Sequence, residues 1–113
     1  MPGVRWLAYA GTWKKMREYL IRTIDEEEFD IPQAKWGEVL RPKSYPSEVT
    51  EGWGALRLKI AGCEVSFSPE PPGTQIVFES GDISAEDADA IVHEIVESAE
   101  SFTGRRGKVI PLQ

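Results

Sequence analysis

The sequence predicts an α+β fold, a two-layer sandwich in which two helices pack on one face of a mainly antiparallel sheet of about four strands. Residues 55–67 alternate apolar and polar side chains around a short turn, and residues 85–103 repeat apolar side chains at helical spacing. No segment repeats another. A chain of 113 residues with 41% hydrophobic and 28% charged side chains is expected to form a single domain over residues 1–113.

The clearest element is a β-hairpin over residues 55–67. In each arm three apolar residues alternate with polar or charged ones, so each arm has a buried side and a solvent-facing side. A turn at Ala61-Gly62 aligns the two apolar rows and places Lys59 opposite Glu64, an opposite-charge pair. The predicted core pairs are Leu56 with Phe67, Leu58 with Val65, and Ile60 with Cys63.

Before the hairpin, residues 1–11 are predicted as an irregular or short helical lead-in, although a strand spacing fits them about as well. Residues 12–28 are predicted as a helix because apolar residues recur there at intervals of three and four. Basic residues near the start and acids near the end oppose the helix dipole, so packing must outweigh them or the helix ends near Asp25. The apolar stripe consists of Trp13, Met16, Leu20 and Ile24.

Residues 30–54 have no clear period and contain three prolines. A stretch this long without structure is unusual in a compact domain, so a helical turn or an edge strand is expected around residues 35–40. The stretch also holds Trp36, Tyr45 and Trp53, and it is the best candidate for a binding surface. Core packing is the competing interpretation of its tryptophans.

After the hairpin, residues 69–73 predict a rigid turn and residues 75–79 a third strand, with Ile76 and Phe78 facing inward and Val77 outward. Residues 80–82 predict another turn. The second helix, residues 85–103, begins after an N-cap at Ser84 and ends at Gly104. Residues 109–112 predict a last strand, which Pro111 confines to a sheet edge.

The net charge of −6 is unevenly spread along the chain. Residues 25–30 carry five acids and no base, and residues 79–100 carry eight acids and no base. Acidic surfaces disfavour nucleic acid, which proteins bind through Lys and Arg, and they favour basic protein partners or simply solubility. No membrane span or signal peptide is read from the sequence, and a single cysteine fits a cytoplasmic location.

No catalytic, metal-binding or cofactor-binding motif stands out. Cys63 is expected in the core, where a thiol is inert. His93 shares a helix face with Asp89 and Glu97, but two carboxylates and one imidazole on a solvated face are a weak metal signal. We therefore expect no catalytic residues, no metal and no cofactor.

Three surfaces are candidates for binding a partner. The first is the acidic run at residues 25–30, with an aromatic residue inside it, which is otherwise a frayed helix end. The second is the tryptophan-bearing stretch, and the third is the acidic face of the second helix, which is otherwise only solvated. The candidate residues are Asp25, Glu26, Glu27, Glu28, Phe29, Asp30, Trp36, Trp53, Glu86, Asp89 and Glu97.

In size, acidity, α+β layout and acidic patches, the chain resembles small bacterial immunity proteins of polymorphic and contact-dependent toxin systems. The resemblance is one of type and assigns no residue roles. It implies a non-catalytic domain that neutralises a toxin by covering a basic surface. The alternatives are a self-associating accessory domain that pairs through a sheet edge, possible as a homodimer, and a small enzyme with an acidic cleft.

Overall fold

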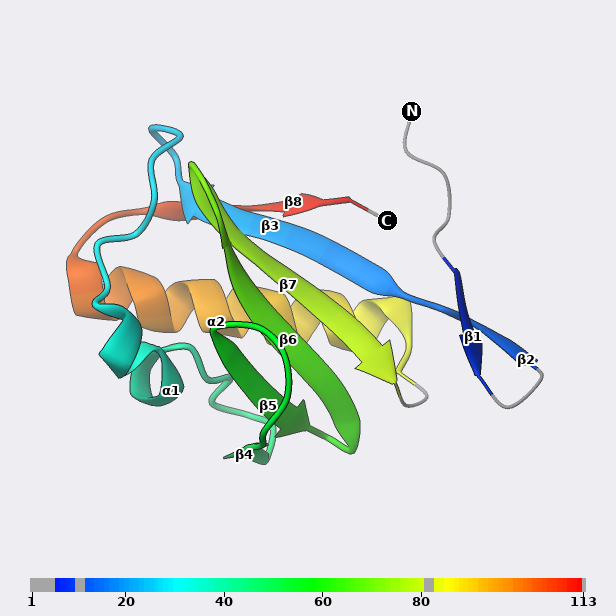
Figure 1. The fold of residues 1–113 in the computed structure, drawn as a ribbon. Helices are drawn as coiled ribbons and strands as arrows, with labels where there is room; N and C mark the ends of the chain where they lie inside the picture. The colour runs from blue at the N-terminus through cyan, green and yellow to red at the C-terminus, as the bar shows by residue number, and fades with distance from the viewer. Residues whose placement is uncertain (1–5, 10–11, 81–82, 113) are drawn as a thin grey trace.

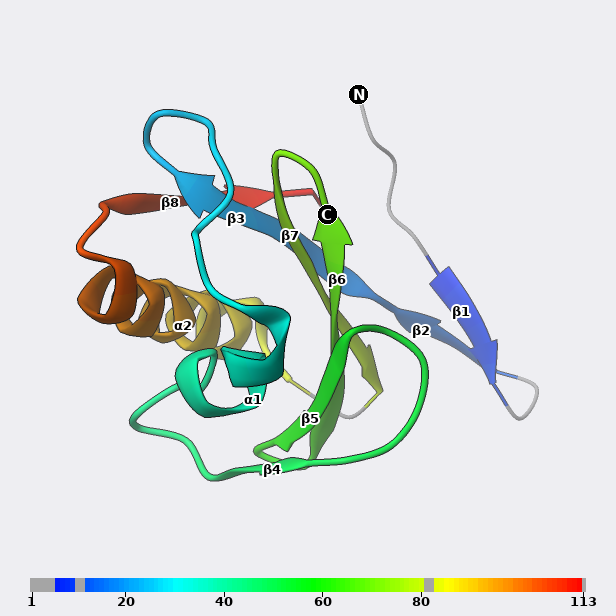
Figure 2. The same cartoon turned by 60° about the vertical axis from the view of Figure 1, so that its left-hand side comes forward.

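The computed structural model describes the backbone of residues 6–9, 12–80 and 83–112. One layer is a six-stranded antiparallel sheet with the strand order β4-β5-β6-β7-β3-β8, and the helices α1 (Trp36–Val39) and α2 (Ala85–Thr103) lie together beside it (Figures 1 and 2). The predicted α+β class is confirmed, but the sheet has six strands and not about four. Its strands are β3 (Arg17–Thr23), β4 (Ser47–Val49), β5 (Leu56–Ile60), β6 (Cys63–Glu70), β7 (Gly73–Ser80) and β8 (Gly107–Pro111).

The predicted hairpin is formed by β5 and β6, and its register is confirmed at all three core pairs. Ala61 and Gly62 both have positive φ, at 50° and 81°, which is the backbone twist that a two-residue hairpin turn requires. Lys59 and Glu64 are opposite each other, as predicted. The carboxylate of Glu64, however, forms its ion pair with Arg57, at 3.1 Å from Nε.

The predicted helix over residues 12–28 is wrong. Residues 12–15 form β2 (Thr12–Lys15), which pairs with β1 (Trp6–Tyr9), and β3 then runs from Arg17 to Thr23. The lead-in is likewise a strand at residues 6–9, while the rest of residues 1–11 lies outside the described part of the chain.

The position of β3 in the sheet explains this difference. It lies between β7 and β8, so both of its edges are hydrogen-bonded. Tyr19, Ile21 and Thr23 face the helices and are buried, and their residue types favour strands. Ile24, which the helical stripe would have placed in the core, is 50% exposed. Pairing along both edges therefore outweighs the helical spacing.

The stretch from residue 30 to residue 54 contains three short elements. A 3₁₀ turn, η1 (Gln33–Lys35), leads directly into α1, which confirms the helical turn expected around residues 35–40. The edge strand β4 follows and pairs with β5. The turn predicted over residues 69–73 is confirmed: β6 and β7 are joined at Pro71-Pro72, whose peptide bond is cis. The turn predicted at residues 80–82 falls largely outside the described residues.

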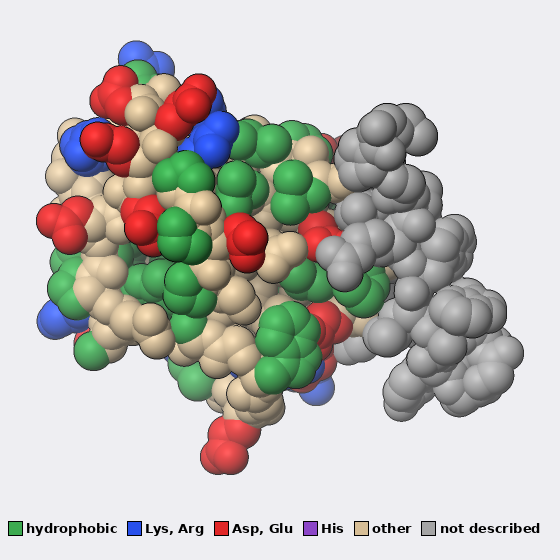
Figure 3. Space-filling view, turned by 45° about the horizontal axis from the view of Figure 1, so that its top comes forward, with side chains coloured by type: hydrophobic (Ala, Val, Ile, Leu, Met, Phe, Trp, Pro, Cys, Tyr) green, Lys and Arg blue, Asp and Glu red, His purple; other side chains and the backbone are tan. Residues whose placement is uncertain are grey.

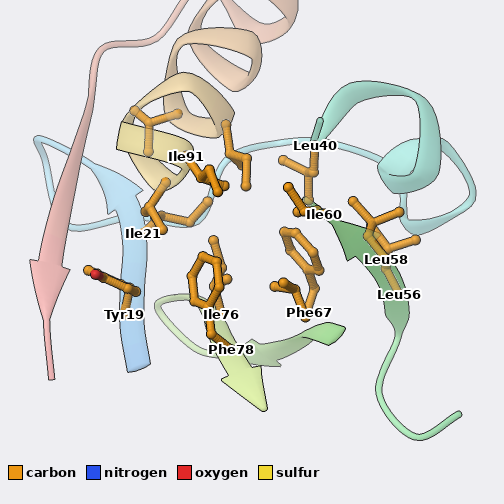
Figure 4. Packing of buried hydrophobic residues seen from close by; sticks show 14 of the residues in the cluster. Tyr19, Ile21, Leu40, Leu56, Leu58, Ile60, Phe67, Ile76, Phe78 and Ile91 are labelled. Carbon is orange, nitrogen blue, oxygen red and sulfur yellow. The ribbon is translucent and has the colours of Figure 1, made fainter. Parts of the chain in front are cut away.

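The helix α2 has the ends that were predicted for it. Ser84 Oγ accepts a hydrogen bond from the Asp87 backbone N–H at 3.0 Å, and Gly104 has a left-handed backbone with φ of 75°. One side of α2 packs across the sheet and closes the core (Figure 4). That side is formed by Ala88, Ile91, Val92, Ile95, Val96 and Ala99.

The strand β8 lies at the edge of the sheet, as Pro111 predicted. Its backbone pairs with β3, and Leu112 N–H extends the ladder by donating to Glu18 O at 2.8 Å. Among the described residues, no helix is both long and apolar enough to cross a membrane.

Candidate functional site

The acidic run at residues 25–30 follows β3 and begins with a tight turn. Thr23 N–H donates to Glu27 O at 2.8 Å, and Thr23 Oγ1 accepts from Glu27 N–H at 3.1 Å. Glu26, at the tip, has a left-handed φ of 62°. The run is therefore an ordered turn and not the frayed end of a helix.

Basic residues after α2 neutralise much of this turn. Arg105 Nη2 lies 2.6 Å from the Glu27 carboxylate and 3.4 Å from that of Asp25, and Lys108 Nζ lies 3.6 Å from that of Glu26. The hydrogen bond that Arg105 donates to Glu27 raises the pKa of the Arg105 guanidinium. Acidic and basic side chains are accordingly mixed at this end of the molecule (Figure 3). Glu28 and Asp30 are exposed beside them.

The aromatic candidates Phe29 and Trp36 serve the core. Phe29 is half-buried and packs against the core cluster next to Gly107. Trp36 is 8% exposed, and its indole N–H donates to Ile31 O at 3.1 Å. Both side chains therefore contribute to the packing of the core.

Trp53 is different, because 57% of its surface is exposed. It lies between Gly52 and Gly54, whose φ values of 154° and 101° suit glycine. Gly52 also packs so closely on the Arg57 side chain that a Cβ there would clash with it. Arg57 in turn lies 5.9 Å from the indole ring, a cation–π contact.

Arg57 belongs to a charged network on the sheet face opposite the helices. Its guanidinium contacts the carboxylates of Glu64 and Glu79, at 3.1 Å and 2.5 Å, and Ser66 Oγ donates to Glu79 at 3.2 Å. The bond to Glu79 raises the pKa of Arg57. Farther along the same face, Gln75 donates to Glu18, which is 1% exposed. These residues were not among the candidates, and the only available signal was their alternation with the core residues.

The acidic candidates on α2 face solvent. Glu86, Asp89 and Glu97 are all exposed, and the helix carries no lysine or arginine. Glu86 and Glu97 are about three helical turns apart, so they lie on one line roughly 16 Å long. Asp89 also accepts a hydrogen bond from the buried Tyr19 hydroxyl at 2.6 Å, which joins the helix to β3. His93, on the same exposed face, contacts Asp89 O through Nδ1 at 2.8 Å.

Two other acids of α2 fasten neighbouring segments. Glu94 accepts from Ser44 N–H at 2.7 Å, and this bond lowers the pKa of the Glu94 carboxyl. Glu100 Oε2 accepts from Gly107 N–H at 2.8 Å, at the start of β8. The side of α2 that faces α1 also lines a hollow of about 470 Å³, whose apolar wall consists of Val39, Pro42 and Phe102.

The candidate residues therefore do not form one surface. Those around Arg105 are paired with bases, Trp53 lies over the sheet face opposite the helices, and Glu86, Asp89 and Glu97 share the outer face of α2. Cys63 is buried, as expected. In the parts of the chain that the structure describes, no group of three or more metal-ligating side chains occurs.

Comparisons with protein-family models, with curated proteins and with solved structures find no match. The functional argument therefore depends on the geometry and charge of this chain.

Proposed function

We propose that this chain is a non-catalytic protein-binding domain of the immunity type, which neutralises a cognate toxin by covering a basic surface with the outer face of α2. The observation that carries the proposal is the charge of that face. Glu86, Asp89 and Glu97 are exposed on a helix of 19 residues that has no basic side chain. Such a face steers a basic partner and rejects an acidic one.

The other acidic candidate has less support as the primary contact. Its carboxylates at residues 25, 26 and 27 already face Arg105 and Lys108. A basic partner would have to displace these bases before it could use the acids. Among the described residues no ion pair involves Glu86, Asp89 or Glu97, so the outer face of α2 is favoured as the docking face.

Self-association through β8 also has less support. Leu112 N–H donates to Glu18 O, and Ile24 N–H donates to Arg106 O. The backbone N–H and C=O groups of the even-numbered residues of β8 therefore point toward β3, and those of the odd-numbered residues point away from the sheet. Of the outward groups, Gly107 N–H is already bonded to Glu100, and Pro111 has no N–H. Only Val109 offers an outward donor along this strand, which makes it a poor template for a second copy.

A catalytic role has the least support. It would require the acidic run, His93 and a loop residue around one cleft. Asp25 and Glu27 instead lie with Arg105 beyond the C-terminal end of α2. His93 is ten residues before that end, or roughly 15 Å along the helix.

The test compares two variants that change the net charge equally. Glu86→Lys with Glu97→Lys reverses the proposed face, whereas Glu51→Lys with Glu70→Lys reverses two exposed acids elsewhere. Each protein is used to capture partners from source-cell lysate, and the captured protein is then purified and titrated by calorimetry at two salt concentrations. We expect a basic partner whose affinity for the α2 variant falls at least tenfold and depends less on the salt concentration.

The control variant should retain its affinity and most of its salt dependence. An equal loss of affinity in both variants would mean that the acids act only through the net charge of the protein. Loss in the control alone would move the interface away from α2. Either result contradicts the proposal.

A further inference from the structure

We infer that the hollow between α1 and α2 receives an apolar side chain of the same basic partner, and that this side chain anchors the complex. The inference rests on the proposed function and adds a second, uncharged contact to it. The partner segment is therefore basic with one aromatic or large aliphatic residue, and not basic alone.

The walls of the hollow are held in place before any partner arrives. Arg41 Nε donates to Gly37 O at 2.7 Å and Arg41 Nη1 to Ser47 O at 3.1 Å, which ties the segment after α1 to both of its neighbours. Ser98 Oγ then donates to Arg41 O at 3.0 Å and joins this segment to α2. Residues that are already held in place lose little conformational entropy when a partner binds, and this favours affinity.

The lining of the hollow suits an uncharged group. Val39, Pro42 and Phe102 supply apolar surface, and Phe102 is 48% exposed although it is a large aromatic residue. The charges at the rim are mixed: Glu38 is acidic, while Arg41 and Lys43 are basic. Arg41 already donates to two backbone carbonyls, and the charge of Lys43 acts on Glu94. The hollow therefore does not attract a cation by itself.

The hollow is continuous with the acidic face. Ser101, which lines it, follows Glu97 by one helical turn, or about 6 Å. A partner segment of roughly 22 Å would thus span the distance from Glu86 to the hollow. The basic part of that segment would bind the acidic face through opposite charge, and its apolar side chain would bind the apolar wall of the hollow. The apolar contact lies at one end of the acidic face, and an aromatic or large aliphatic side chain bound there would act as an energetic hot spot.

The experiment uses two synthetic lysine-rich helical peptides that differ at one position, tryptophan in the first and alanine in the second. Each is titrated into the ¹⁵N-labelled full chain and followed by amide chemical shifts. We expect both peptides to shift amides along residues 86–97. Only the tryptophan peptide should also shift those of residues 39–43 and 98–102, and it should bind about fivefold to tenfold more tightly.

Phe102→Ala should remove the advantage of the tryptophan peptide, and Phe102→Leu should restore part of it. Trp53→Ala, on the opposite side of the molecule, is the matched control and should change neither affinity. Because Phe102 is half exposed, the far-UV circular dichroism spectra of Phe102→Ala and Phe102→Leu should match that of the wild type. Equal affinity of the two peptides, or an advantage that survives Phe102→Ala, would overturn the anchor and leave the acidic face standing. Binding of neither peptide, or equal binding to Glu86→Lys with Glu97→Lys, would overturn both.

Discussion

At the scale of single residues, Gly107 shows how one position connects three segments. It begins β8, and its N–H is bonded to Glu100 of α2. A Cβ at this position would overlap the ring of Phe29 and lie 2.8 Å from Val96 Cγ1. The Phe29 ring can therefore pack against the core only because residue 107 is a glycine, which has no side chain. An aromatic residue within an acidic run gave no sign of this, because the contact joins residues 78 positions apart.

Gly107→Ala should consequently destabilise the fold by about 1–3 kcal/mol, because the Phe29 ring must move to admit the methyl group. The measurement is the free energy of unfolding from urea denaturation. Gly37→Ala is the matched control: its Cβ would meet its nearest neighbours at 3.7 Å and 3.8 Å, which are ordinary contacts. Alanine favours the helical backbone of α1, so the control should be neutral or more stable by up to about 1 kcal/mol. Equal stability of both variants would contradict the packing argument.

At the scale of elements, local sequence patterns correctly predicted α2 and the β5–β6 hairpin. The helix predicted in place of β3 was wrong because β3 is formed by pairing with strands far away in the sequence. In the hairpin, both faces agree on one register over short sequence distances. In β3, the pairing partners are β7 and β8, which begin more than 50 residues later, and no local pattern reveals them. The reversed charge order at residues 12–28 was the one local sign against a helix.

The candidate site was predictable to a similar degree. The acids of α2 follow from its helical period, so Glu86, Asp89 and Glu97 were correctly expected on one solvent-facing side. The pairing of Asp25, Glu26 and Glu27 with Arg105 and Lys108 depends on where β8 returns to β3, and could not be read locally. The hollow at Phe102 is also non-local, because its two walls come from segments about 60 residues apart.

The N-cap of α2 makes a prediction at this scale. Ser84→Ala removes the acceptor for the Asp87 N–H and should lower the free energy of unfolding by roughly 0.5–2 kcal/mol. Ser101→Ala, at an exposed position within the same helix, is the control and should change stability little. Chemical denaturation followed by circular dichroism measures both. An unchanged denaturation midpoint for Ser84→Ala would contradict a stabilising role of the Ser84 side chain at the start of α2.

At the scale of the whole molecule, the two layers are joined by apolar packing and by one hydrogen bond of particular interest. Tyr19 of β3 is 2% exposed and donates to Asp89 of α2 at 2.6 Å. Burial first, and then the bond and charge of Asp89, raise the pKa of the Tyr19 hydroxyl above its ordinary value of 10.0. The folded protein therefore keeps this proton at a pH where the unfolded chain has lost it.

The sign of the resulting pH dependence follows directly. Below about pH 10 both states hold the proton and the contribution of Tyr19 to stability is complete, and above it the unfolded state gains by ionising. Tyr19→Phe should thus be less stable by about 0.5–1.5 kcal/mol at pH 7, and the difference from wild type should shrink as the pH rises from 10 toward 11.5. Urea denaturation across this range measures it. Asp89→Ala keeps the buried Tyr19 hydroxyl, so its difference from wild type should change much less over this range, and a double-mutant cycle should give a coupling energy between the two residues. A constant difference between Tyr19→Phe and wild type at every pH would mean that the hydroxyl proton does not link the helix layer to the sheet.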